Sequence, residues 1–256
     1  MFDVAVIRQS SLDNLRDRVE DLRKKLQTLQ DKCFIEGTPE SQRNRLSELL
    51  SVSSSQFRQD LFVLSELDFK RSGYFVEFGA CEGVTISNTL LLEREFGWEG
   101  ILAEPCRAWH SELKSSRRAH ISTKCVWSRS GEELTFTQAP SPVISTMEAF
   151  RDSDGLGDRR KRGRSYRVET ISLTDLLLQF GAPREIDYLS IDTEGSELEI
   201  LKAFDFSRYR IEIITVEHNF MPVRGEIFEL LTSRGYVRKY EHLSLVDDWY
   251  VLADQA

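Results

Sequence analysis

The sequence has few cysteines and no long apolar run, and each shortage excludes a class of protein. Its four cysteines are widely spaced with no Cys-x-x-Cys pair, which indicates neither a disulfide framework nor a zinc site. No stretch approaches the ~20 apolar residues of a membrane-spanning helix. The N-terminal residues lack the basic and apolar regions of a signal peptide, so we expect a reduced protein in the cytoplasm.

An excess of positive charge is also missing. The formal net charge is −8, so the phosphates of nucleic acid would be repelled on average, and we expect no general affinity for nucleic acid. With 40% hydrophobic and 30% charged residues, the composition is ordinary for a globular protein. A length of 256 residues leaves room for one substantial α/β domain and an appendage.

The appendage is an N-terminal segment with a strict heptad pattern. Its apolar residues recur at alternating spacings of three and four: Leu12, Leu15, Val19, Leu22, Leu26 and Leu29. This spacing predicts a heptad helix over residues 1–33 that pairs as a coiled coil and makes the protein a homo-oligomer. In a parallel homodimer, however, Arg18 would face Arg23 of the second copy, which is repulsive. The alternative is that the helix lays its apolar stripe on the acidic globular body of its own chain.

The rest of the chain reads as a helical lead-in over residues 34–70 and an α/β domain over residues 71–256. In the domain, apolar strand-like runs alternate with helical periodicity, which predicts a Rossmann-like, mostly parallel sheet with right-handed crossovers and a closing antiparallel strand. A helix is expected over residues 84–96. The expected strands are residues 74–78, 101–104, 121–127, 134–137, 168–171, 187–192, 211–218, 236–240 and 249–252.

Residues 139–167 are expected to be irregular, because prolines and glycines interrupt any periodicity there. They also carry the chain's only basic cluster, which consists of Arg159, Arg160, Lys161, Arg162, Arg164 and Arg167. Such a run is usually a solvated loop, but a long loop inside a compact domain can also act as a lid. As a lid, this basic loop would favour an anionic acceptor; a nuclear-import signal is a weaker interpretation.

Carboxylates gather at the ends of the predicted strands: Glu77, Glu104, Asp192, and Glu217 followed by His218. In an open parallel sheet, ligands bind outside the carboxyl ends of the strands, so we expect the site at this edge. Gly79 and Gly83 supply a tight turn after the first strand. A carboxylate at the end of the second strand suits ribose hydroxyls, because it accepts two hydrogen bonds at once.

Three segments resemble the FkbM family of S-adenosylmethionine-dependent methyltransferases. They are residues 77–89 (EFGACEGVTISNT), 97–105 (GWEGILAEP) and 186–197 (IDYLSIDTEGSE), and the Asp-x-Glu-Gly-x-Glu signature is the most specific. The resemblance extends over roughly residues 55–252 and leaves the heptad segment out. It implies the class I methyltransferase sheet, S-adenosylmethionine as cofactor, and O-methylation of hydroxyls of sugars and natural products.

The resemblance also implies roles for individual residues. The methionine end of the cofactor would be held by Glu77, Gly79, Ala80 and Gly83. Glu104 would hold the ribose, and Ser128, after the third strand, lies where adenine contacts are expected. Asp192 would sit beside the sulfonium at the reaction centre.

A sugar hydroxyl is a poor nucleophile, so a general base would accelerate its attack by about 10²–10⁴-fold. His218, placed at a strand end, is the first candidate base and Asp192 the second. His218 can equally be a structural histidine. Alternatively, Asp192, Glu194 and His218 gather a divalent cation that acidifies the acceptor hydroxyl.

The leading interpretation is thus an O-methyltransferase that acts on a carbohydrate, such as a glycan or glycolipid precursor. The alternative is a non-catalytic protein that uses the fold and the heptad helix as an assembly or regulatory partner. A nucleotide-dependent oxidoreductase is disfavoured, because Cys81 occupies the middle glycine position of a dinucleotide motif and Glu77 would repel a pyrophosphate.

Overall fold

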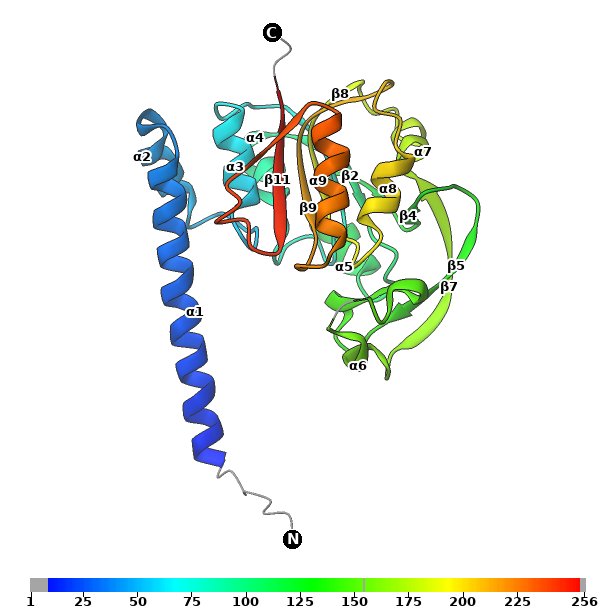
Figure 1. The fold of residues 1–256 in the computed structure, drawn as a ribbon, viewed down its shortest axis with the longest axis horizontal. Coiled ribbons are helices and arrows are strands. Elements are labelled where there is room, and N and C mark those ends of the chain that lie inside the picture. The colour runs from blue at the N-terminus through cyan, green and yellow to red at the C-terminus, as the bar shows by residue number, and fades with distance from the viewer. Residues whose placement is uncertain (1–8, 154, 254–256) are drawn as a thin grey trace. The chain divides into compact units, whose positions relative to one another are not determined.

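The computed structural model describes residues 9–153 and 155–253, so residues 1–8 of the predicted heptad helix lie outside the described residues. The chain divides after Ser51 into two compact units. The first contains α1 (Gln9–Gly37) and α2 (Glu40–Leu49). The second contains a large sheet with helices on both faces and a smaller second sheet (Figure 1).

The first unit is a long helix followed by a short one. Its corner at Gly37 is fixed by hydrogen bonds, because the Thr38 hydroxyl donates to the Ile35 carbonyl (2.7 Å) and Arg43 of α2 donates to the carbonyls of Thr38 and Glu36 (3.1 and 2.8 Å). None of the helices in the described ranges combines the length and the apolarity needed to cross a bilayer.

The large sheet of the second unit has seven strands in the order β10-β11-β9-β8-β1-β2-β3. Strands β9, β8, β1, β2 and β3 are parallel, and β11 runs antiparallel to β9 and β10. This arrangement confirms the predicted mostly parallel sheet with antiparallel closure. The strands are β1 (Tyr74–Phe78), β2 (Glu99–Ala103), β3 (His120–Ser122), β8 (Glu185–Ile191), β9 (Arg210–Glu217), β10 (Tyr236–Lys239) and β11 (Asp247–Leu252).

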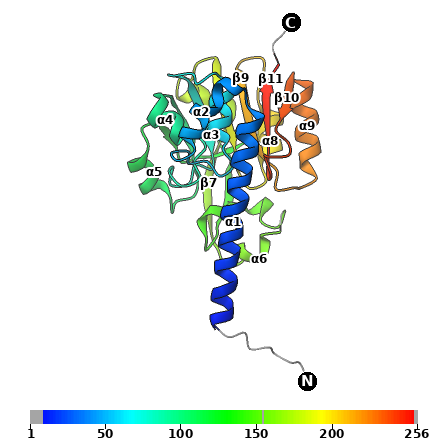
Figure 2. The ribbon, with the colours of Figure 1, turned by 90° about the vertical axis from the view of Figure 1, so that its left-hand side faces the viewer.

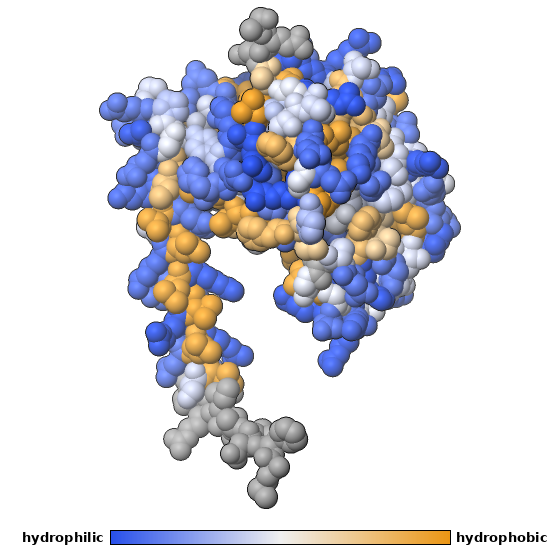
Figure 3. All heavy atoms as spheres, viewed as in Figure 1, coloured by the Kyte–Doolittle hydropathy of each residue, from blue (hydrophilic) through white to orange (hydrophobic). Residues whose placement is uncertain are grey.

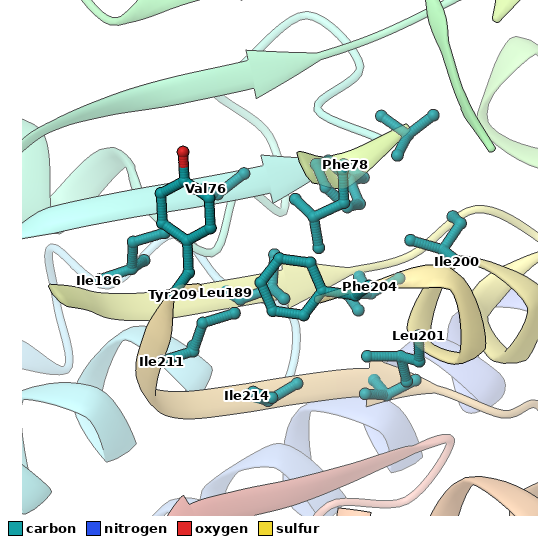
Figure 4. Packing of buried hydrophobic residues seen from close by; sticks show 14 of the residues in the cluster. Val76, Phe78, Ile186, Leu189, Ile200, Leu201, Phe204, Tyr209, Ile211 and Ile214 are labelled. Atoms are coloured by element: carbon teal, nitrogen blue, oxygen red, sulfur yellow. The ribbon is translucent and has the colours of Figure 1, made fainter. Parts of the chain in front are cut away.

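Helices cover both faces of this sheet (Figures 1 and 2). One face carries α3 (Gln59–Glu66), α4 (Leu90–Phe96) and α5 (His110–Ser116), and the other carries α7 (Leu173–Gln179), α8 (Glu197–Ala203) and α9 (Val223–Ser233). Side chains alternate between the faces, so that Val76 and Phe78 of β1 join the core beneath α8. Figure 4 shows this core, with Leu201 and Phe204 packed over Ile214.

The predicted third strand, residues 121–127, is two strands in two sheets. Strand β3 ends at Ser122, whose hydroxyl accepts a hydrogen bond from the Lys124 N–H (3.3 Å). The chain turns there, and β4 (Cys125–Trp127) pairs with β7 (Arg164–Ser172) instead. Strands β5 (Glu133–Gln138) and β6 (Thr146–Met147) complete a four-stranded sheet in the order β4-β7-β5-β6.

Residues 139–167 are more ordered than predicted. Residues 164–167 extend β7, because each pairs with a residue of β5 in an antiparallel ladder. Three short helices lie between β5 and β7: η1 (Pro142–Ile144), η2 (Glu148–Phe150) and α6 (Gly157–Arg160). The prolines and glycines that indicated a loop therefore separate short elements rather than leaving the chain irregular.

The helix predicted over residues 84–96 begins only at Leu90. The preceding loop is held by the buried Glu77 carboxylate, which accepts hydrogen bonds from the Asn88 N–H (2.7 Å) and the Thr89 hydroxyl (2.5 Å). In a helix the Asn88 N–H would donate to a backbone carbonyl one turn earlier. Because it donates to Glu77 instead, the loop is not helical. The cost of burying Glu77 is met by the same contacts.

Arg117 completes this network from the end of α5. Its fully buried guanidinium lies 3.6 Å from Glu77 and 3.4 Å from Glu93, both of which are also buried. It donates to the Gly83 carbonyl (3.1 Å) and to the Thr89 hydroxyl (2.8 Å). One arginine thus compensates two interior carboxylates.

We predict that Arg117→Ala lowers the free energy of unfolding by about 3–5 kcal/mol, because it leaves Glu77 and Glu93 buried without their cation. Denaturant unfolding followed by circular dichroism measures the change. Arg184→Ala, at an exposed position before β8, is the matched control and should change stability by less than about 0.5 kcal/mol. Equal effects of the two variants would contradict the assigned role of Arg117.

Candidate active site

A cavity of about 240 Å³ lies at the carboxyl ends of β1, β2, β8 and β9, the edge at which the sequence predicts a ligand. Its walls come from the turn after β1, the loop before α4, the ends of the other strands, and residues 142–147 of the smaller sheet's connections. Five carboxylates are among the lining residues: Glu77, Glu104, Asp192, Glu194 and Glu217.

The turn after β1 lets two strand ends approach closely. Gly79 has φ +72°, and a Cβ atom there would lie 1.9 Å from the Asp192 carbonyl oxygen. Gly79 and Ala80 line the cavity. Gly83 (φ +81°) does not: a Cβ atom there would lie 2.6 Å from Cγ of Arg117, so this glycine serves the packing of α5.

Glu77 lines the cavity, but its carboxylate is engaged by the loop before α4 and by Arg117, as described above. Beside it, Asn88 donates its amide N–H to the Ser190 hydroxyl (2.9 Å). The other amide atom, Oδ1, is buried and accepts no hydrogen bond within the described ranges. Because Asn88 also lines the cavity, this oxygen is available to a donor on a ligand.

Glu104, just after β2, holds its carboxylate in a defined orientation. One oxygen accepts from the Cys81 N–H (2.9 Å) and the other from the Cys106 N–H (2.7 Å). Each oxygen keeps a second lone pair, so the group can accept a pair of hydroxyls from a ligand. Burial raises the pKa of Glu104 to about 7, despite these two N–H donors.

The Asp-x-Glu-Gly-x-Glu signature forms the turn between β8 and α8. Glu197, the last carboxylate of the signature, accepts from the N–H groups of Thr193 (2.9 Å) and Gly195 (3.1 Å) and so fixes the turn. Glu194 accepts from the buried guanidinium of Arg160 (2.8 Å), which comes from the predicted basic loop. Asp192 is left lining the cavity.

Asp192, Glu194 and Glu217 converge. One carboxylate oxygen from each lies within 4.8 Å of the other two, which is a spacing suited to a cation. Burial, reinforced by Asp247, raises the pKa of Asp192 to about 7. Burial and the neighbouring Asp192 raise the pKa of Glu217 well above its ordinary value. The two groups therefore resist carrying full charge together.

His218 does not join these carboxylates. Its Nδ1 accepts from the Phe220 N–H (3.0 Å), and its buried Nε2 lies 3.7 Å from Asp248. Of the predicted cation ligands, the structure brings Asp192 and Glu194 together and adds Glu217 rather than His218. Ser128 follows β4 and is not among the residues that line the cavity.

A second hollow of about 220 Å³ adjoins the first. The two share Glu194, Glu217 and Asn219. His218 lines this second hollow, whose other walls are largely apolar side chains: Phe150, Met221, Pro222 and Val223. The two hollows thus share a wall that includes the Glu217 carboxylate.

Sequence reasoning missed three residues of this region. Glu217 was named only as a charged strand end, because His218 next to it has the more familiar chemistry of a base. The sequence gives no role to Asn88 or Arg117, since the periodicity predicts a helix across Asn88 and no motif includes Arg117. The alternation of side chains along β9 was the one available signal that separates Glu217 from His218.

A model of the Methyltransferase FkbM domain matches residues 77–238. Precorrin-6y C5,15-methyltransferase from Geobacter metallireducens GS-15 is similar in structure over 70% of this chain and 71% of its own, with a TM-score of 0.37 and 13% identity. A Galdieria sulphuraria protein described as a sarcosine dimethylglycine methyltransferase is similar over 71% of this chain and 62% of its own (TM-score 0.33, 14% identity). No match was found among curated proteins.

The raised carboxyl pKa values predict how the stability of the ligand-free protein depends on pH. Glu104, Asp192 and Asp247 have folded pKa values of about 7, against about 4 in an unfolded chain. The stability gained by keeping them protonated is complete below pH of about 4 and is lost as pH rises through about 7. The melting temperature should therefore be several degrees higher at pH of about 5.5 than at about 8.

Differential scanning calorimetry at the two pH values measures this difference. Asp247→Asn should reduce it, whereas Glu185→Gln, which alters an exposed carboxyl at the start of β8, should leave it unchanged. A melting temperature that rises between the two pH values would contradict the prediction.

Proposed function

Since the chain belongs to the FkbM methyltransferase domain family and is an S-adenosylmethionine-dependent methyltransferase, we propose that it methylates a hydroxyl group of a carbohydrate or a similar small molecule. The observation that carries this proposal is the pair of adjoining hollows, one lined by acids and one walled by apolar side chains, which meet at Glu217. The bound cofactor supplies an electrophilic methyl group, and the chain supplies position, charge and a proton acceptor.

The acid-lined cavity fits the chemistry of the cofactor. Its carboxylates suit the positive sulfonium and amino groups, and the Glu104 carboxylate suits the ribose diol. The unpartnered Oδ1 of Asn88 suits a donor such as the amino group. Gly79 and Ala80 remain the expected backbone contacts at the methionine end, whereas Ser128 as an adenine contact rests on the family resemblance alone.

The second hollow suits the acceptor. Apolar side chains such as Phe150 and Met221 can pack on the carbon face of a sugar ring. Glu194 and Glu217, where the hollows meet, can receive hydrogen bonds from ring hydroxyls. A hydroxyl placed there would be held close to the transferred methyl group, and such positioning supplies much of the rate enhancement in a displacement reaction. The exposed residues of the basic cluster support an acceptor with an anionic group.

Three groups near this junction are candidates to accept the hydroxyl proton. Glu217 is favoured because it lines both hollows and its raised pKa makes it a better base than an ordinary carboxylate. Asp192 lines the cofactor cavity beside it. For His218 to act, its ring would have to turn, since Nδ1 is engaged by Phe220 and Nε2 is buried next to Asp248.

A divalent cation at Asp192, Glu194 and Glu217 is the alternative way to activate the hydroxyl. The Arg160 guanidinium already compensates Glu194, which lowers the negative charge available to a cation. If turnover survives chelation by EDTA, a carboxylate accepts the hydroxyl proton without a cation. If turnover is lost on chelation and restored by Mg²⁺, a divalent cation activates the hydroxyl.

Titration calorimetry with S-adenosylhomocysteine tests the cofactor site. We predict micromolar binding to the full chain and affinity about 10²-fold weaker for Glu104→Ala, because two hydrogen bonds to a charged group are lost. Glu99→Ala, at the opposite end of β2, should bind like the unaltered chain. Absence of binding to the unaltered chain, or equal binding to Glu104→Ala, would contradict the assignment of this cavity to the cofactor.

Transfer of a labelled methyl group from S-adenosylmethionine to a panel of nucleotide sugars and glycolipids tests the acceptor class. On the acceptor so found, Glu217→Gln should lower kcat by about 10²–10⁴-fold with little change in S-adenosylhomocysteine affinity. Glu212→Gln, at the start of the same strand, is the control. Full activity of Glu217→Gln together with an inactive His218→Ala would reverse the assignment of the base.

A further inference from the structure

The heptad seam of α1 is the largest apolar feature of the chain that the proposed function does not use. Leu15, Leu22, Leu26 and Leu29 are each more than half exposed, and Val19 is 40% exposed. Figure 3 shows them as a continuous apolar stripe along the helix. No described residue of the first unit covers this stripe, so its occupant has to be inferred from the residues that flank it.

The charges of α1 are sorted by position. With Leu12 at heptad position a, the charged residues at the flanking e and g positions are all cations: Arg16, Arg18, Arg23, Lys25 and Lys32. The outer b, c and f positions carry mostly acids: Asp13, Asp17, Glu20, Asp21 and Asp31, with Lys24 as the exception. The helix therefore presents an apolar seam between two basic borders, and its acidic face is turned away.

These borders disfavour pairing with a second copy. In a parallel pair the g residues of one helix face the e residues of the other, which sets Arg18 against Arg23. In an antiparallel pair g faces g and e faces e, which again joins cations. Either orientation of a self-paired helix thus brings like charges together, and like charges at these positions select against a partner.

The narrow apolar face and the acidic outer face disfavour a membrane. An interfacial helix has a wide apolar face and a polar face rich in Lys and Arg. In α1 the apolar face is confined to the a and d positions and the outer face is acidic, so α1 has neither of these features. A stripe confined to a and d positions is the geometry by which one helix packs against another.

We propose that α1 forms a heterotypic coiled coil with a helix of another protein, one that carries leucine-type residues at a and d and Asp or Glu at e and g. The basic borders would then face acids on both sides of the seam. Within the chain, the border cations make exposed ion pairs, such as Lys25 with Asp21 (2.7 Å) and Arg16 with Asp13 (3.5 Å). Exposed pairs of this kind contribute little and are readily exchanged for a partner's carboxylates.

The test uses the full chain and two designed three-heptad peptides that share Val and Leu at a and d. One peptide carries Glu at every e and g position and the other carries Lys. Fluorescence anisotropy of labelled peptide should give binding of the Glu peptide at least about tenfold tighter than that of the Lys peptide, because several border pairs change sign together. The preference should shrink in high salt.

A charge-reversed chain is the matched variant: Arg16→Glu, Arg18→Glu, Arg23→Glu and Lys25→Glu. It should prefer the Lys peptide, and a mixture of the reversed and unaltered chains should form a one-to-one complex in sedimentation analysis while each alone stays monomeric. Leu15→Gln with Leu22→Gln should abolish both interactions, and circular dichroism checks that the chain remains folded.

The proposal is overturned by any of four results. The first is a dimer of the unaltered chain that becomes a monomer on Leu15→Gln with Leu22→Gln. The second and third are equal binding of the two peptides and binding of neither. The fourth is binding to vesicles of anionic phospholipid that the same double substitution abolishes. The first identifies a second copy as the occupant and the last identifies a membrane. Methyltransferase activity is not part of the readout, so failure here leaves the proposed function untouched.

Discussion

Glu77 places a carboxylate in the interior at the end of the central strand, and a buried carboxylate has to be paired or hydrogen-bonded to be tolerated. Its partners come from two directions: the loop before α4, through the Asn88 N–H and the Thr89 hydroxyl, and Arg117 at the end of α5. The loop that satisfies Glu77 also forms one wall of the cavity. The position of that wall therefore follows from the need of the buried Glu77 carboxylate for hydrogen-bond donors. Helix α4 begins directly after the residues that supply them.

Along the same sheet edge the carboxylates differ in how fully the protein satisfies them. Glu77 has a cation and several donors, whereas Glu104 has two N–H donors and spare lone pairs. Asp192 and Glu217 have no cation in the part of the chain that the structure describes, and burial raises the pKa of both, reinforced by Asp247 for Asp192 and by Asp192 for Glu217. The edge thus carries one structural acid, Glu77, and acids on either side of it that gain more from a positively charged ligand. This difference is a physical reason for a cationic cofactor to bind near Asp192 and Glu217 rather than at Glu77.

The sheet and its polarity were predictable from sequence, because alternating strand and helix periods and carboxylates at strand ends are local signals. The smaller sheet was not predictable, since the pairing of β4 with β7 joins segments 45 residues apart (Cys125 with Thr170) and depends on a turn at Ser122 that looks like strand. The same holds for the site. Glu104 and Asp192 could be named from motifs, but the environment of His218 depends on Phe220, which donates to Nδ1, and on Asp248 beside the buried Nε2, which only the folded chain brings together.

The smaller sheet has a consequence for the speed of ligand exchange. Strand β7 begins in that sheet and runs without a break into α7, which packs on the core of the large sheet. The ladder between β7 and β5 holds one end of the segment between these strands, and the buried contact of Arg160 with Glu194 holds the other. To swing aside as one body, the smaller sheet and its connections would have to break the Arg160–Glu194 contact. Entry and departure of the cofactor would then wait on small local fluctuations of the short elements around residues 142–150, which makes product release a natural candidate for the slowest step of the catalytic cycle.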